Sequence, residues 1–341
     1  MKIYGIDFTS APSPKKAITS AECTLTEKGL VLERLGRLTS FEEFEAFLRE
    51  PGPWVAGMDF PFGQPRTLIE NLDWSRTWDG YVSVVTGMAK SRFADALTNY
   101  CHGRKKGDKH HLRLTDRLAH SRSPMMLYRV PVAKMFFEGA PRLLLAGVSI
   151  QPCHVRVTSR LVVESYPALV ARRWIGHRSY KTDTPKQQSL ERQSAREEIL
   201  RGLRSDDVKM HFGFDVHFNH RDAGVFLQDG SGDQLDALLC AIQAGWAYSQ
   251  RDRNFGIPRH CDRLEGWIVD PLLAEAEQPS TNSDTNARIS AGYQLFKGNW
   301  SAVGLLFNFG RRKLDYRRVF PGKDMKPVKR IGRDNALKPR R

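Results

Sequence analysis

Two short segments of the chain place an aspartate at the end of an apolar run, two residues after a glycine. Gly5-Ile6-Asp7-Phe8 is the first, and Gly57-Met58-Asp59-Phe60 is the second. Side chains alternate along a strand, so Gly5 and Asp7 lie on one face. Aspartate is unfavourable in a strand and an unpaired buried charge is costly, so each carboxylate needs a partner. A metal ion is one candidate, and the glycine leaves the sheet face beside it open.

Three more acids fall at the expected ends of other elements. Glu164 closes an apolar segment that begins at Arg160. Asp233 and Asp236 are three residues apart at the start of a predicted helix, so they share one helical face. Small residues follow on that helix, where a sheet can approach closely; they are Ala237, Cys240 and Ala244.

Carboxylates that converge need a cation between them. Two of them about 4 Å apart repel by roughly 4 kcal/mol at an effective dielectric constant near 20. Mg²⁺ and Mn²⁺ suit a set of oxygen ligands, and two such ions can hold the attacking and leaving oxygens of a phosphoryl displacement. We therefore predict a Mg²⁺ or Mn²⁺ site. Its predicted ligands are Asp7, Asp59, Glu164, Asp233 and Asp236, and the predicted catalytic residues are Asp7, Asp59 and Asp236.

Each of these acids, taken alone, has an ordinary structural alternative. Aspartate at a strand end is often a turn residue, and aspartate in a first helical turn interacts favourably with the helix dipole. The metal site is favoured by the whole set, in which every acid lies at the end of an element.

An α/β fold is expected to position the acids. Residues 2–36 predict three strands, residues 41–48 a short helix, and the segment up to Asp59 a strand that returns parallel to the first. Ligands of such sheets bind beyond the carboxyl ends of the strands, where Asp7 and Asp59 would then lie side by side. Residues 61–158 form a large and mostly helical insertion before the next core strand at 160–166.

The chain is strongly basic. Of its 341 residues, 53 are Lys or Arg and 38 are Asp or Glu, which gives a net charge of +15. This balance favours nucleic acid as a partner. Residues 311–341 hold 13 of the basic residues and three acids, so a solvated tail is the alternative. The predicted domain covers 1–270, with a linker at 271–288 and a basic C-terminal extension at 289–341.

Basic side chains in three places are candidate nucleic-acid contacts. A basic loop follows the predicted helix over 90–100, a polar cluster contains Arg113, Asp116 and Arg122, and the third group lies in the C-terminal extension. Surface charge on a helical insertion is the alternative for the polar cluster. The candidates are Arg104, Lys105, Lys106, Arg113, Arg311, Arg312 and Lys313.

Cysteine usage and hydropathy indicate a cytoplasmic protein. The five cysteines are widely spaced and form no C-x-x-C motif, which is typical of reduced thiols. The N-terminus enters a predicted strand directly, without the pattern of a signal peptide. No apolar run reaches the roughly 18 residues of a membrane span, so no membrane partner is expected. The oligomeric state stays open.

Four motifs resemble those of the DUF429 family. They are Gly5-Ile6-Asp7-Phe8-Thr9-Ser10-Ala11-Pro12, Gly57-Met58-Asp59-Phe60-Pro61-Phe62-Gly63, Glu164-Ser165-Tyr166-Pro167 and Asp233-Gln234-Leu235-Asp236-Ala237. The family is regarded as predicted nucleases, and the resemblance implies a ribonuclease H-like mixed five-stranded sheet flanked by helices. It spans roughly residues 2–270. The order of acids is also similar to RuvC-type resolvases, which implies metal binding by Asp7, Asp59, Asp233 and Asp236; Glu164 has no counterpart there.

Three functions compete on these grounds. A metal-dependent nuclease is the first hypothesis. The second is a nucleic-acid-binding module with an inactive site. The third is an ATPase related to actin or sugar kinases, whose first strand also ends in Gly-x-Asp; the segment Ala11-Pro12-Ser13-Pro14 offers fewer backbone N–H groups to phosphates than the usual glycine-rich loop of that class.

Overall fold

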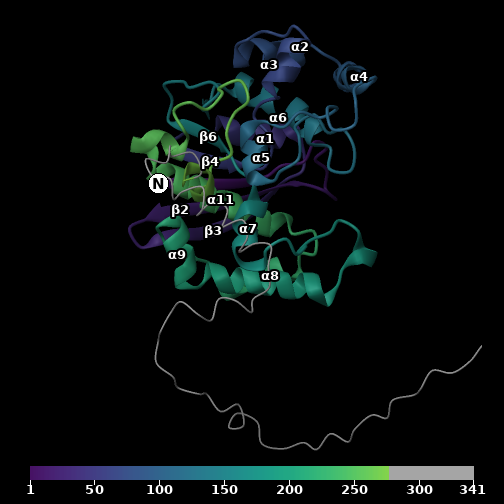
Figure 1. The fold of residues 1–341 in the computed structure, drawn as a ribbon. Helices are drawn as coiled ribbons and strands as arrows, with labels where there is room; N and C mark the ends of the chain where they lie inside the picture. The colour runs from purple at the N-terminus through teal and green to yellow at the C-terminus, as the bar shows by residue number, and fades with distance from the viewer. Residues whose placement is uncertain (276–341) are drawn as a thin grey trace, which may run out of the picture. The chain divides into compact units, whose positions relative to one another are not determined.

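A mixed β-sheet organises the part of the chain that the computed structural model describes, residues 1–275 (Figure 1). In these residues seven strands pair in the order β5-β6-β4-β1-β2-β3-β7. Strands β1, β2 and β3 form an antiparallel meander, and the other neighbouring pairs are parallel. The strands are β1 (Lys2–Asp7), β2 (Ile18–Thr26), β3 (Gly29–Leu38), β4 (Trp54–Met58), β5 (Ser149–Gln151), β6 (Arg160–Glu164) and β7 (Val216–His217).

Helices cover both faces of this sheet, so the protein has the predicted α/β class. The helices are α1 (Phe41–Arg49), α2 (Arg66–Asn71), α3 (Trp78–Thr86), α4 (Lys90–Cys101), α5 (Leu114–Ala119), α6 (Val132–Ala146), α7 (Pro167–Ile175), α8 (Leu190–Leu203), α9 (Asp206–Phe212), α10 (His220–Gln228), α11 (Asp233–Ser249) and α12 (Pro271–Glu275). Two 3₁₀ segments, η1 (Pro185–Gln187) and η2 (Arg251–Gly256), complete the set in residues 1–275.

Two hydrophobic cores lie on opposite faces of the sheet. Ile3 of β1 packs in the core that contains α7, α8 and α11, whereas Tyr4 and Ile6 pack in the core that contains α1, α3 and α6. The alternation expected for β1 is therefore present. Figure 1 shows α2, α3 and α4 on the opposite side of the sheet from α8 and α9.

The predicted strand count was wrong. Within residues 1–275, the sheet contains two short strands at its edges in addition to five longer ones. These are β5, with three residues, and β7, with two. β5 falls inside the predicted insertion 61–158, so this segment is not wholly separate from the sheet. The first residues of the predicted linker form α12. The basic C-terminal extension, with Arg311, Arg312 and Lys313, lies outside the described residues.

The parallel pairing of β1 with β4 is confirmed, and it fixes the place of the two glycine–aspartate segments. Gly5 lies opposite Gly57, and the Asp59 N–H donates to the Ile6 carbonyl at 2.9 Å. The chain therefore leaves both strands at one end of the sheet with two aspartates side by side. Among residues 1–275, no helix has the length and apolar character needed to cross a membrane.

Candidate metal centre

Asp7, Asp59 and Asp236 converge at the carboxyl ends of β1 and β4. A carboxylate oxygen of each lies within 4.8 Å of an oxygen of the other two. Asp7 is 9% exposed and Asp236 is fully buried, while Asp59 is partly exposed. Asp7 ends β1, Asp59 follows β4, and Asp236 comes from the first turn of α11. The structure thus brings together three of the five predicted ligands.

Glycine in both strands lets α11 lie close enough to the sheet to bring Asp236 to the other two acids. A Cβ atom on Gly5 would stand 1.8 Å from the Ala237 carbonyl oxygen, and one on Gly57 would stand 2.4 Å from that of Cys240. No side chain larger than hydrogen fits at either position. The small residues expected along this helix are therefore the ones that contact the sheet.

Burial and the charge of neighbouring carboxylates raise the pKa of all three carboxyl groups. Loss of solvation is the largest cause for Asp59, and the charge of Asp236 adds to it, so its pKa rises to about 7. The pKa of Asp7 is raised well above its ordinary value by burial and by Asp236, Asp233 and Asp59. The pKa of Asp236 is also raised, chiefly by burial. Lys181 opposes each of these shifts.

Lys181 and Tyr180 contact the buried Asp236 carboxylate from the segment between α7 and α8. The Lys181 ammonium group pairs with Oδ2, and the Tyr180 hydroxyl donates to Oδ1 at 2.5 Å. Burial lowers the pKa of Lys181, but attraction to Asp236, Tyr180, Asp7 and Asp59 outweighs it and leaves the pKa well above its ordinary value. Sequence reasoning missed both residues, because Ser179-Tyr180-Lys181 resembles any polar loop.

The three carboxylates fit a hard divalent cation. All donors are oxygens, which is the ligand type preferred by Mg²⁺ and Mn²⁺. Within residues 1–275, no hydrogen bond reaches the carboxylates of Asp7 and Asp59, so their lone pairs remain available to an ion. A cluster of three acids with raised pKa values is typical of a functional site.

Asp233 does not join the three acids. Its carboxylate pairs with Lys16, whose ammonium nitrogen lies 2.8 Å from Oδ2 and 2.7 Å from an oxygen of Asp183. Its backbone carbonyl accepts a hydrogen bond from Thr19 at 2.8 Å. The predicted ligand Asp233 is therefore an ion-pair partner that ties the start of α11 to the β1–β2 connection.

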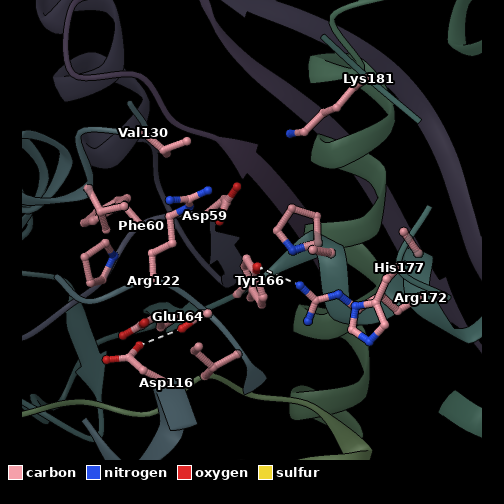
Figure 2. Close-up of a pocket in the computed structure, with 18 of the residues that line it drawn as sticks. Asp59, Phe60, Asp116, Arg122, Val130, Glu164, Tyr166, Arg172, His177 and Lys181 are labelled. Carbon is pink, nitrogen blue, oxygen red and sulfur yellow. Dashed lines mark hydrogen bonds between the residues drawn. The ribbon is translucent and has the colours of Figure 1, made fainter. Parts of the chain in front are cut away.

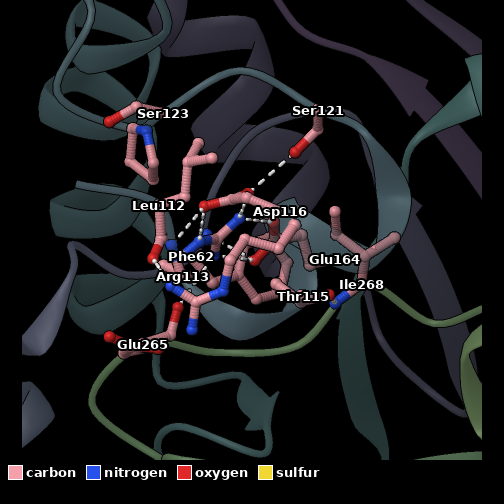
Figure 3. A network of polar contacts seen from close by, with 12 residues as sticks. Phe62, Leu112, Arg113, Thr115, Asp116, Ser121, Ser123, Glu164, Glu265 and Ile268 are labelled. Carbon is pink, nitrogen blue, oxygen red and sulfur yellow. Dashed lines mark hydrogen bonds and ion pairs between the residues drawn. The ribbon is translucent and has the colours of Figure 1, made fainter. Parts of the chain in front are cut away.

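Glu164 and Arg113 pair with each other, which corrects two predictions (Figure 3). The Arg113 guanidinium donates to both Glu164 oxygens at 2.6 and 2.8 Å and to both Asp116 oxygens at 2.8 and 2.9 Å. The Phe62 N–H adds a further hydrogen bond to Glu164 at 2.9 Å. Arg113 is 1% exposed and Glu164 2%, so Arg113 is not a surface contact for nucleic acid and Glu164 is not one of the converging acids.

The predicted basic loop is present after α4. Arg104 pairs with Asp108 at 3.0 Å and lies over the Tyr100 ring, whereas the Lys105 and Lys106 side chains are exposed. None of the three basic residues lines the cavity that contains Asp59. Their contact with nucleic acid stays a prediction.

A cavity of about 350 Å³ opens beside Asp59 (Figure 2). One part of its wall comes from the insertion, with Arg122 and Val130, and another comes from α7 and the segment after it, with Arg172 and Lys181. Tyr166 lies between these parts and accepts a hydrogen bond from Arg172 at 3.1 Å. The acidic centre therefore adjoins a space large enough for a small ligand.

The fold and the site define a three-layer α/β protein with a largely buried three-carboxylate centre at the ends of parallel strands. The chain belongs to the DUF429 family: the family model, described as a protein of unknown function, matches residues 5–260. No curated protein and no solved structure matches the chain.

Proposed function

We propose that this protein is a divalent-metal-dependent nuclease that hydrolyses phosphodiester bonds. The convergence of Asp7, Asp59 and Asp236 from two parallel strands and a helix carries the proposal. Ligands of α/β sheets bind at this end of the strands. A ribonuclease H-like fold is part of the same proposal, supported by the β1–β2–β3 meander, the parallel strands β4 and β6 beside it, and α11 across β1 and β4.

In this proposal the three aspartates hold Mg²⁺ or Mn²⁺. The bound metal supplies an activated water and offsets charge on the leaving oxygen. Tyr180 orients the Asp236 carboxylate through its hydrogen bond. Lys181 keeps a positive charge beside the acids, where a substrate phosphate would add negative charge. The net charge of +15 supports nucleic acid as the partner.

Calorimetric titration with Mn²⁺ tests the metal site. We expect the wild type to bind and Asp7→Asn to lose at least about tenfold in affinity, since it removes one ligand charge. Asp233→Asn is the matched control, because this aspartate pairs with Lys16 outside the three-acid centre. Loss of affinity in Asp233→Asn but not in Asp7→Asn would contradict the proposed ligand set.

Cleavage assays with single-stranded and duplex DNA and RNA test the activity itself. We expect cleavage that requires Mg²⁺ or Mn²⁺ and is abolished in Asp7→Asn. The second candidate, a nucleic-acid-binding module without catalysis, is favoured by Lys181, whose ammonium group already offsets part of the carboxylate charge. Metal-independent binding to nucleic acid that persists in Asp7→Asn, with no cleavage in any metal, would establish that candidate instead.

A further inference from the structure

The cavity beside Asp59 contains two arginines without a carboxylate partner. Among the described residues 1–275, no acid pairs with Arg122 or Arg172. Arg172 donates to the Ala119 carbonyl at 2.9 Å and to the Tyr166 hydroxyl at 3.1 Å, and neither acceptor neutralises its charge. Arg122 is exposed at the cavity wall. Their positive charge is available to an anion.

Other cations of the same cavity are already paired. Arg113 holds Asp116 and Glu164, Arg178 pairs with Glu198, and Lys181 contacts Asp236. Figure 2 shows Arg122 and Arg172 reaching in from opposite sides of Tyr166, with Arg122 extending toward Asp59. Both arginines line the same cavity as Asp59, so an anion that they hold lies in the space that adjoins the acidic centre. Arginine is well suited to phosphate, because its guanidinium can donate two hydrogen bonds to one group.

An apolar and aromatic lining accompanies this charge. Val130, Val132 and Met135 are among the lining residues, and the Tyr166 ring lies on the wall between the arginines. Val130 is 47% exposed, so its apolar surface is accessible to a ligand in the cavity. Flat, largely apolar groups such as nucleic-acid bases pack on aromatic and aliphatic walls of this kind.

We propose that this cavity binds one nucleotide unit, with its phosphate held by Arg122 and Arg172 and its base against the apolar wall. The inference rests on the proposed function, because the bound nucleotide is taken to be part of the nucleic-acid strand whose phosphodiester bond is cleaved beside Asp59. The cavity volume of about 350 Å³ accommodates a single unit of this size. The phosphate contacts position the strand, and they carry no sequence information.

Titration of the full-length chain with adenosine 5′-monophosphate in the absence of divalent metal tests this inference. We expect one molecule to bind per chain, and Arg122→Ala to weaken binding about tenfold, as the loss of one charge-assisted hydrogen bond does. Arg172→Ala should weaken binding by at least as much. Arg221→Ala is the matched control, because this exposed arginine of α10 does not line the cavity. Because Arg122 is exposed and has no ion-pair partner in residues 1–275, we expect Arg122→Ala to leave the fold intact.

Inorganic phosphate and adenosine serve as separate probes of the two halves of the ligand. If inorganic phosphate binds as tightly as the nucleotide, the cavity binds an anion and does not recognise the base. If adenosine binds as tightly as the nucleotide, the arginines do not contribute to binding. Either result, or nucleotide binding unchanged in both arginine variants, overturns the inference. The Mn²⁺ titration of Asp7→Asn is independent of this binding, so failure of the metal site and failure of the nucleotide site are distinguished.

Discussion

Lys181 places an ammonium group where three carboxylates converge. A divalent ion that binds Asp7, Asp59 and Asp236 must compete with this group for Asp236. We expect Lys181→Met to increase the affinity for Mn²⁺ about tenfold, because the ion no longer has to displace the ammonium group from Asp236. A tenfold change corresponds to the free energy of one charged hydrogen bond. Calorimetry measures the affinity, and Lys186→Met in the exposed segment nearby is the control. Weaker Mn²⁺ binding would mean that Lys181 supports the ion instead of competing with it.

The same variant should destabilise the metal-free protein at neutral pH. Without the ammonium group, the buried acids repel one another with less compensation. The melting temperature of Lys181→Met should therefore fall below that of the wild type, and saturating Mn²⁺ should narrow the difference. Thermal unfolding with and without Mn²⁺ measures both effects. An unchanged melting temperature without metal would contradict this role of Lys181.

The titration of Asp59 makes the free energy of unfolding depend on pH. Its pKa rises from 3.8 to about 7 on folding, mainly through burial, so the folded state holds the proton more tightly than the unfolded chain. The resulting stabilisation is fully present below pH 3.8 and is lost as the pH rises through about 7. Between these values the metal-free wild type should lose stability relative to Asp59→Asn, as measured by thermal unfolding. Mn²⁺ binds the ionised form, so its affinity should rise over the same range.

The contact between α11 and the sheet is the element-scale feature that assembles the centre. Gly57→Ala would place a Cβ 2.4 Å from both the Cys240 carbonyl oxygen and the Ser165 hydroxyl. We expect it to lower the free energy of unfolding by about 1–3 kcal/mol and to weaken Mn²⁺ binding, because α11 and Asp236 must move away. Chemical denaturation and calorimetry measure the two effects.

Gly224→Ala on α10 is the control for this substitution. A Cβ there meets no atom within 4 Å, and alanine is favoured over glycine inside a helix. Its stability should be unchanged or slightly increased, with Mn²⁺ binding intact. Equal losses in Gly57→Ala and Gly224→Ala would show that the close packing of α11 has no special role.

Local pattern was enough to predict the elements that carry the three acids. The two glycine–aspartate segments placed Asp7 and Asp59 on neighbouring strands, and helical spacing placed Asp236 on a helix. Helical spacing also selected Asp233, because position along a helix does not reveal that Lys16, more than 200 residues earlier in the chain, pairs with it.

Pairing across the fold explains the other errors. Glu164 resembled a ligand because it ends a strand, but Arg113 from the insertion neutralises it. The edge strands β5 and β7 are too short to show a strand period. Lys181 carries no local signal, because a lysine in a polar segment is ordinary. Such contacts depend on the packing of distant segments and leave no trace in residue spacing.

At the scale of the whole molecule, charge is concentrated at one end of the sequence. Residues 311–341 contain 13 basic and three acidic residues, which is +10 of the net +15. If this segment binds nucleic acid, a chain ending at residue 310 should bind more weakly and with a smaller salt dependence. Each lost phosphate contact lowers the slope of log affinity against log salt by about 0.7–0.9.

Binding of labelled DNA and RNA at several salt concentrations measures this slope. The Mn²⁺ affinity of the shortened chain is the control and should equal that of the full chain, because the three aspartates lie within residues 1–275. An unchanged salt slope would assign nucleic-acid binding to the remaining residues, which carry a net charge of +5.

The Arg113 cluster has a further consequence for recognition. Asp116 also accepts a hydrogen bond from Ser121 at 2.8 Å, so the arginine that joins Glu164 of β6 to α5 fixes the backbone next to Arg122 as well. One wall of the cavity is therefore anchored to the sheet before any ligand arrives. Binding of a ligand that matches this wall costs little conformational entropy, because the wall is already ordered. A ligand of another shape would have to distort the wall, which costs free energy. For the ligand proposed above, this wall is therefore preorganised by folding.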